Sequence, residues 1–432
     1  MNSTENEGNS YPGVPVTRDR YSELDRLVNE GGYDAYLTIA DGSDSNMVYL
    51  SGFEAPDPYV YLRIPDVSGP DDPGLSSEES GVSVLLVSVL ERGRAEKEAS
   101  VDKVRGTSEF VDGDIRGDPD AKYEVWSRLL SEYGVDEVAV PGDFGLRRHD
   151  ELEERGFTVD AVDDVIGESR AVKTREEVEE LRGVQQLNEE VLNMAEEMLV
   201  NAEVLSVDDV ESMGSDHGLP KDGEVLYLDG EPLTAERVRN EIKVGWLRRG
   251  CSPEEPIVAC GPRGADPHWR GEGVLRADEP IILDLFPEGP SGYYGDMTRT
   301  WVKGSADGEV LEMYDAVQES LSAGLDSVEA GVEAEYVHGT VCDVLEDGGY
   351  KTERMGDIDE GFIHSTGHGV GMDLHEKPRL GSGGGELKSG MVVTVEPGLY
   401  LKDLGGLRIE DMVVVTDDGY RNLNSYHKDL EI

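Results

Sequence analysis

The first part of the chain alternates between helix-like and strand-like hydrophobic patterns. The stretches YSELDRLVNEGG and DAKYEVWSRLLSEYG repeat apolar residues at helical spacing, and both end in glycine. The short apolar runs AYLTIA, NMVYLSGF, YVYLRI, VSVLLVSV and DEVAVPG are typical of strands. This alternation predicts an α/β domain with a mixed sheet over residues 1–168.

A second domain, residues 169–432, is predicted to begin with a long amphipathic helix. Thr174 followed by Glu177 has the pattern of a capping box. Apolar residues then keep helical spacing at Val178, Leu181, Val184, Leu187, Val191 and Met198. The glycine- and acid-rich stretch 203–232 predicts a loop-rich insertion or lid, and TAERVRNEIKVGWLRRG predicts another helix.

The last part of the chain shows a pattern of paired strands. PIILDLFP with GYYGDMTRTWV forms one predicted pair, and GMVVTVEPGLYL with GLRIEDMVVVT forms a second. Two long helices and a histidine-rich stretch lie between the pairs. Two hairpin-like pairs separated by two helices indicate a pseudo-symmetric α+β domain.

Each strand pair carries two acids where apolar residues would be expected. They are Asp284 and Asp296 in the first pair, and Glu396 and Glu410 in the second. Alternate residues of a strand share a face, so Arg408 and Glu410 point the same way. Buried carboxylates need partners, and four convergent ones cannot all stay ionised without cations between them. The pattern therefore predicts a metal site to which a histidine could add a nitrogen ligand.

Three of the eight histidines lie within the stretch HSTGHGVGMDLHE, at positions 364, 368 and 375. With EPGLY, GLRIED and GYYGDMTRT, this stretch resembles the pita-bread metallopeptidases, which include prolidase, aminopeptidase P and methionine aminopeptidase. The resemblance covers at least residues 170–420. YDAYLTIADGSDSNMVYLSGF also resembles the first domain of the prolidase and aminopeptidase P branch, which methionine aminopeptidases usually lack. The Xaa-Pro branch is therefore favoured.

The resemblance implies an α+β pita-bread catalytic domain that binds two divalent metal ions. The five ligands it implies are Asp284, Asp296, His368, Glu396 and Glu410. Asp296 and Glu410 would bridge the two ions. Asp284 would complete one metal site, and His368 with Glu396 would complete the other. Manganese is the first expectation, with cobalt or zinc as alternatives.

The resemblance also implies residues that handle the substrate and its protons, namely His268, His364, His375, Glu396 and Arg408. Glu396 is expected to accept a proton, while His268 and His375 stabilise the oxyanion and position the substrate. Tyr400 matches a family residue near the ligands. A structural role stays open for His268, His364 and Arg408, and Arg408 could merely neutralise Asp284 or Glu410.

The implied function is hydrolysis of Xaa-Pro bonds in small peptides with proline at the second position, by a homodimer. A metal-free hydrolase resembling creatinase and a non-catalytic binding module remain alternatives on the same fold. Two departures from the family pattern concern the first strand pair. Phe286 stands where a glycine is usual, and Asp284 and Asp296 lie one residue further apart than usual. The extra residue is expected in the turn PEGPSG.

Charge adds a prediction about the environment of the protein. The chain has 93 acidic and 39 basic side chains, a formal net charge of −54, with the acids spread along its length. Such a surface repels itself unless salt screens it, which indicates a salt-rich cytoplasm and argues against nucleic acid or membrane partners. The N-terminus lacks signal-peptide features, and the three cysteines show no ligand or disulfide spacing. An acidic interaction protein is the alternative.

Overall fold

The computed structural model describes residues 11–65, 81–111, 120–214, 218–356 and 358–432. Its contacts divide the chain into two compact units, Arg18–Arg170 and residues 11–17 together with Ala171–Ile432. The chain thus enters the C-terminal unit first, leaves it for the N-terminal unit and then returns. Within the described ranges, no helix has the length and hydropathy of a membrane span.

The N-terminal unit is built on one six-stranded sheet with the order β4-β3-β2-β1-β5-β6. Its strands are β1 (Ala35–Ala40), β2 (Tyr59–Ile64), β3 (Val82–Val87), β4 (Lys103–Gly106), β5 (Glu137–Pro141) and β6 (Thr158–Val162). Its helices are α1 (Ser22–Gly31), α2 (Ser45–Ser51), α3 (Arg92–Glu98), α4 (Ala121–Glu132), α5 (Leu146–Glu153) and α6 (Val165–Ala171). Parallel and antiparallel strand pairs both occur, so the sheet is mixed as predicted.

One strand prediction in this unit is wrong, because NMVYLSGF forms the helix α2. The Asp44 carboxylate accepts the Met47 N–H at 2.7 Å and caps the helix, and Gly52 ends it in the left-handed conformation. Met47 and Leu50 are fully buried at helical spacing. A short apolar run is compatible with a strand or a helix, and here the caps at both ends favour the helix.

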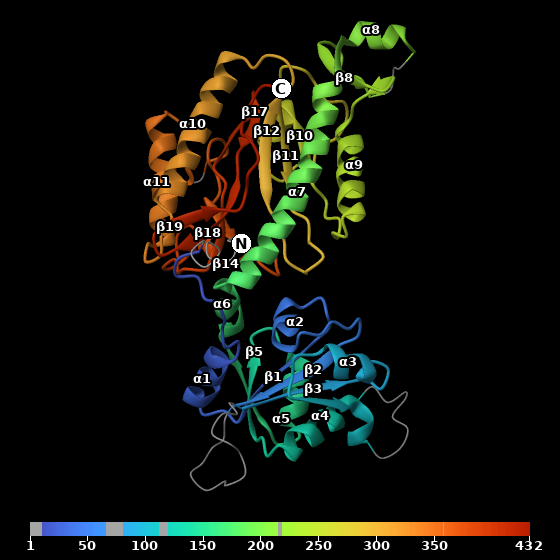
Figure 1. The fold of residues 1–432 in the computed structure, drawn as a ribbon, viewed down its shortest axis with the longest axis vertical. Helices are drawn as coiled ribbons and strands as arrows, with labels where there is room; N and C mark the ends of the chain where they lie inside the picture. Colours follow the sequence, from blue (N-terminus) through green and yellow to red (C-terminus); the bar gives the residue numbers. More distant parts are fainter. Residues whose placement is uncertain (1–10, 66–80, 112–119, 215–217, 357) are drawn as a thin grey trace, which may run out of the picture. The chain divides into compact units, whose positions relative to one another are not determined.

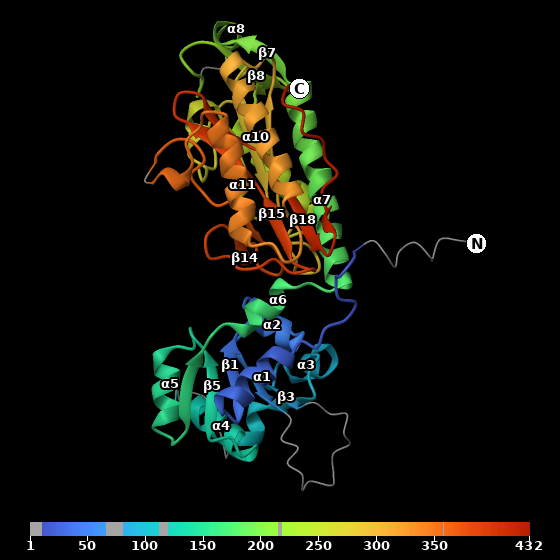
Figure 2. The same ribbon diagram turned by 90° about the vertical axis from the view of Figure 1, so that its left-hand side faces the viewer.

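In the C-terminal unit the sheets lie between two pairs of helices (Figures 1 and 2). On one side are α7 (Arg175–Asn201) and α9 (Ala235–Arg248), and on the other α10 (Gly308–Asp326) and α11 (Ala334–Asp347). The predicted capping box of α7 is confirmed, since Thr174 and Glu177 satisfy each other's backbone N–H groups. The sheet strands are β10 (Ile257–Cys260), β11 (Pro280–Leu285), β12 (Met297–Val302), β13 (Gly367–Gly369), β14 (Glu376–Leu380), β15 (Val392–Val395), β18 (Asp411–Thr416) and β19 (Gly419–Asn422).

The predicted second pair of strands is divided into two. β15 pairs with β18, while β16 (Gly398–Leu401) pairs with β17 (Gly405–Arg408) in a separate ladder. Pro397 lies at the break, where its missing N–H ends regular pairing. The two glutamates lie at this interruption, Glu396 after β15 and Glu410 between β17 and β18.

The described residues of the stretch 203–232, namely 203–214 and 218–232, have more regular structure than the loop-rich prediction. They include β7 (Glu203–Ser206), α8 (Val207–Ser212), β8 (Glu224–Leu228) and β9 (Glu231–Pro232), and the three strands form one small sheet. Val207, Val210 and Val225 are buried together. In Figure 1 this sheet lies beyond the upper end of α7. The glycines and acids of this segment predicted a loop, but its small apolar cluster is enough to give it regular structure.

Candidate metal centre

The C-terminal unit contains a cavity of about 480 Å³ into which all the predicted site residues project. Its charged and polar lining comprises His268, Asp284, Asp296, His364, Ser365, His368, His375, Glu376, Arg379, Glu396, Arg408 and Glu410. Ile257, Pro267, Phe286 and Leu374 supply apolar walls. Residues that lie up to 142 positions apart in the sequence, from His268 to Glu410, therefore share one space.

The first strand pair delivers its two aspartates to the same face. β11 and β12 pair in a continuous antiparallel register with Asp284 opposite Thr298, and Asp296 lies two residues before Thr298. The additional residue between the aspartates therefore lies in 286–296, outside the paired strands, and their register is undisturbed. The Asp296 N–H is held by Gln185 Oε1 of α7 at 3.0 Å. Asp284 and Asp296 are 8% and 4% exposed.

The second half of the cluster is fixed by threonines and main-chain bonds. The His368 N–H donates to Thr394 Oγ1 at 3.1 Å, and the Glu396 N–H donates to Thr366 O at 2.8 Å. The Glu410 N–H reaches across to Thr298 O at 3.1 Å. Through this last bond the interrupted strand of Glu410 is tied directly to the strand that carries the aspartates.

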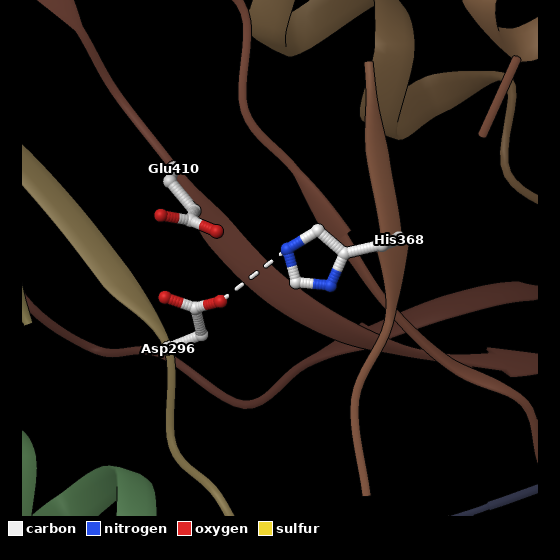
Figure 3. Close-up of side chains that lie close together, drawn as sticks. All are labelled: Asp296, His368 and Glu410. Atoms are coloured by element: carbon white, nitrogen blue, oxygen red, sulfur yellow. Dashed lines mark ion pairs between the residues drawn. The ribbon is translucent and has the colours of Figure 1, made fainter. Parts of the chain in front are cut away.

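The imidazole of His368 lies among three of the predicted carboxylates. Its Nε2 is 3.5 Å from Asp296 Oδ2 and 3.4 Å from Glu396 Oε1. One ligand atom each of Asp296, His368 and Glu410 lie within 4.8 Å of one another, and Figure 3 shows the three side chains pointing toward a common centre. Asp284 lines the same cavity, where the Arg408 guanidinium holds its Oδ2.

The donor set fits divalent cations. Asp284 Oδ1 and Glu410 Oε1 are buried without any hydrogen-bond partner. Burial raises the pKa of Asp296 and of Glu410 well above the usual range, and the neighbouring carboxylates add to the effect. A cation between these groups would supply the partner that the two oxygens lack and the charge that the cluster needs. Four carboxylates and one imidazole suit Mn²⁺, Co²⁺ or Zn²⁺.

Arg408 forms a hydrogen-bonded bridge behind the ligands. Besides Asp284, its guanidinium binds Thr298 Oγ1 at 3.0 Å and Tyr400 Oη at 2.8 Å. His364 Nε2 is 3.1 Å from the same Tyr400 hydroxyl. Burial, followed by the Arg408 charge, lowers the pKa of His364 to about 3, so this imidazole is neutral in the folded chain. The contact of Arg408 with Asp284 is the neutralising role that the sequence left open.

His375 and His268 lie at the exposed side of the cavity. The ring of His375 packs edge-on against the ring of His368, with centroids 4.2 Å apart and planes at 85°. Glu396 faces the same space, and burial raises its pKa to about 7. The predicted residues thus divide into a buried carboxylate cluster and two imidazoles that a ligand entering the cavity would meet.

Two supporting residues escaped the sequence analysis. Thr298 is fully buried and donates its hydroxyl to Glu410 Oε2 at 2.7 Å. Strand alternation was a usable signal, since Thr298 shares a face with Asp296. Gln185 is a fully buried amide on the largely apolar buried face of α7, which also holds Asn188. A polar residue at a core position was the corresponding signal there.

Comparison with known proteins agrees with this geometry. The profile of metallopeptidase family M24 matches residues 179–417. The chain belongs to this family. The Xaa-Pro dipeptidase of Pyrococcus furiosus is 30% identical over 277 residues, which are 62% of this chain and 67% of that protein. The PepE proteins of Mycobacterium tuberculosis are 36% identical over 176 residues, but the match spans only 45% of their length.

Solved structures extend the likeness to almost the whole fold. The prolidase from Pyrococcus horikoshii OT3 superimposes with a TM-score of 0.73 at 22% identity, covering 96% of this chain and 100% of the other. The Xaa-Pro dipeptidase from Bacillus anthracis gives the same TM-score and identity, covering 96% and 99%. The predicted fold, an α/β domain followed by a pita-bread domain, is therefore confirmed.

Proposed function

We propose that this protein is a metal-dependent peptidase that cleaves Xaa-Pro bonds in small peptides. The observation that carries the proposal is the convergence of Asp284, Asp296, His368, Glu396 and Glu410 on one cavity, where two buried carboxylate oxygens lack partners. These five residues would hold two divalent ions, with manganese as the first expectation. The likeness to Xaa-Pro dipeptidases of Pyrococcus furiosus and Bacillus anthracis supports the substrate class.

Bound divalent ions would supply a water of lowered pKa and polarise the scissile carbonyl. In hydrolysis the water oxygen bonds to the carbonyl carbon, the C–N bond breaks, and a proton passes to the proline nitrogen. Glu396 faces the cavity and is our candidate to carry that proton. His375 and His268 line the same cavity and would donate their N–H groups to the carbonyl oxygen. His364 and Arg408 both bind the Tyr400 hydroxyl, and Arg408 would hold Asp284 in place.

The cavity suits a short peptide. Its volume of about 480 Å³ lies within the range of small-molecule sites, and its walls are apolar at Ile257, Phe286 and Leu374. A proline ring needs an apolar surface and offers no N–H to be satisfied. A carboxylate or amine of the peptide would find charged groups at the same cavity.

The same observations give less support to the two alternative functions. A creatinase-like hydrolase without metal would not need five metal-binding side chains in one cavity. A binding module would not need them either. Composition and the family resemblance also suggest the oligomeric state and the environment of the protein. We infer a homodimer in a salt-rich cytoplasm, with the two compact units as the predicted domains and residues 11–17 added to the catalytic one.

A peptide-cleavage assay tests this proposal. An Xaa-Pro dipeptide and an Xaa-Pro-Xaa tripeptide are incubated in about 2 M KCl, where charges are well screened, with Mn²⁺, Co²⁺, Zn²⁺ or a chelator. We expect metal-dependent cleavage that His368→Ala abolishes and that His149→Ala, on helix α5 of the N-terminal unit, leaves intact. A folded protein that binds no metal and cleaves neither peptide would reject the proposal.

A further inference from the structure

A buried ion pair lies next to the cavity but outside the ligand set. Lys173 Nζ is 2.9 Å from Glu376 Oε2, and the two side chains are only 1% and 5% exposed. Lys173 is the one buried lysine among the residues that the structure describes. Burying two charges is costly even when they are paired, so such a pair is weak evidence for stability alone. Its place in the fold indicates another role.

The Glu376 carboxylate organises the loop that carries His375. Its Oε1 accepts the Asp373 N–H at 3.1 Å, and the Gly371 N–H donates to Asp373 O at 3.1 Å. A Cβ on Gly371 would lie 2.3 Å from Glu376 Oε2, so only glycine lets the loop close on the carboxylate. Residues 371–376 therefore wrap around one buried acid.

This loop sets the position of the His375 ring. Gly369 pairs with Glu376 across β13 and β14, and the register shifts between His368 and Gly369. The irregularity separates the ligand histidine from the loop that returns at His375 and Glu376. His375 directly precedes Glu376, so a displacement of that carboxylate would move the ring packed on His368.

Lys173 is in turn anchored to the sheet of the metal cluster. Its N–H donates to Gly390 O at 2.7 Å, and Val172 bridges to Met391, the residue before β15. β15 contains Thr394, which holds the His368 N–H. Thr174, which follows Lys173 in the chain, is the N-cap of α7. The backbone of Lys173 is thus held beside β15 on one side and at the start of α7 on the other, and this fixes where its ammonium group lies.

We propose that Lys173 and Glu376 are a positioning pair that holds His375 against His368 at the open side of the cavity. The inference rests on the proposed function only for its catalytic consequence. Neither residue touches the reacting atoms in this scheme. The pair acts through the loop 371–376, and its removal should leave the five metal ligands in place.

The first variant is Lys173→Met, which keeps most of the side-chain length and removes the charge. We expect kcat to fall about 10- to 100-fold, as is usual when a supporting contact of a metal site is lost. KM and metal affinity should change little. Arg63→Met is the matched control, since Arg63 is as buried as Lys173, with 1% of its side chain exposed, and pairs with Asp25 in the N-terminal unit. An equal fall of kcat in both variants would overturn the proposal.

Should Lys173→Met fail to fold, Glu376→Gln tests the same contact. Lys173 Nζ and the Asp373 N–H bond to different oxygens of the carboxylate, and in glutamine one of these oxygens is replaced by an NH2 group that cannot accept. Combining either variant with His375→Ala shows whether the pair acts through His375. We expect the double variant to be no slower than His375→Ala alone. Independent, multiplying losses would contradict a positioning role.

Histidine-ring NMR signals give a readout that does not need turnover. The His375 signal, assigned by its loss in His375→Ala, should shift or broaden in the Lys173 or Glu376 variant, while His149 and His427 stay unchanged. An unmoved His375 signal would reject the positioning pair. Because this measurement works even if the wild-type protein cleaves no Xaa-Pro peptide, failure of this inference and failure of the proposed function are separate outcomes.

Discussion

At the scale of single residues, the candidate metal cluster depends on buried hydroxyls as well as on its acids. Thr298 donates to Glu410 Oε2 and accepts from Arg408 Nε, so one hydroxyl connects a carboxylate to the guanidinium behind it. Loss of this hydroxyl should therefore take a hydrogen-bond partner from both side chains at once, although Arg408 keeps its bonds to Asp284 and Tyr400.

Thr298→Val removes the hydroxyl while keeping the shape. We expect the free energy of unfolding to fall by about 1–3 kcal/mol, because buried polar groups of Glu410 and Arg408 lose a partner. Metal affinity should weaken as well, since Glu410 is no longer oriented. Calorimetry for both quantities, with Thr158→Val at an exposed position of β6 as a control, checks this. Unchanged stability and affinity would show that Thr298 is replaceable packing.

His338 should make the stability of the fold depend on pH, and it is not one of the candidate metal ligands. Its ring is buried between Thr366 Oγ1 and Glu353 Oε1, both at 2.9 Å, with Cys342 and Arg354 nearby. Burial lowers the pKa of His338 below its usual value, although the Glu353 charge opposes the shift. The folded chain therefore prefers the neutral ring.

The sign of the effect follows from this direction. Above the unfolded pKa of about 6.5 the ring is neutral in both states and contributes no pH dependence. As the pH falls below that value the unfolded chain takes up a proton first, so the folded state loses stability. His338→Gln should lose less stability than the wild type between pH 7 and pH 5, as denaturant titrations at each pH would show. Parallel losses would place the His338 pKa at its ordinary value.

At the scale of elements, the start of α7 joins local and tertiary structure. Thr174 and Glu177 close a capping box, and the helix then continues for 27 residues with one face buried. Thr174→Ala should lower the free energy of unfolding by about 1 kcal/mol, the usual contribution of an N-cap. Thermal unfolding measures this. Thr234→Ala, which removes the N-cap of α9, should cost a similar amount, and a negligible loss would mean that packing alone holds α7.

The same element shows what the sequence could reveal. The cap, the spacing of Val178 and Leu181 and the strand pair that holds Asp284 are local patterns, and the structure agrees with each of them. The helix α2 and the break at Pro397 were missed, because short apolar runs look alike until caps and pairing partners are known. The bond of Arg408 to Asp284 joins residues 124 apart, and no local pattern encodes it.

At the scale of the whole molecule, charge is the dominant physical feature. A formal net charge of −54 on 432 residues repels itself in the folded state. Surface ion pairs such as Arg94 with Glu98 oppose this only weakly, because each exposed pair contributes about 0–1 kcal/mol. The acids outnumber the bases by 54, so one-to-one pairing with the bases would leave more than half of the 93 acidic side chains without a basic partner.

Salt should therefore stabilise this protein rather than weaken it. Raising KCl from about 0.1 M to about 1 M shortens the Debye length from roughly 10 Å to roughly 3 Å, which removes most of the repulsion between acids. We expect the unfolding temperature to rise steeply over this range and peptide cleavage to rise with it. Sucrose at equal osmolarity stabilises compact states without screening charge, so it should replace KCl only in part. A cooperative fold with full activity in salt-free buffer would contradict the inference of a salt-rich cytoplasm. Equal effects of sucrose and KCl would assign the stabilisation to solvent exclusion instead of charge.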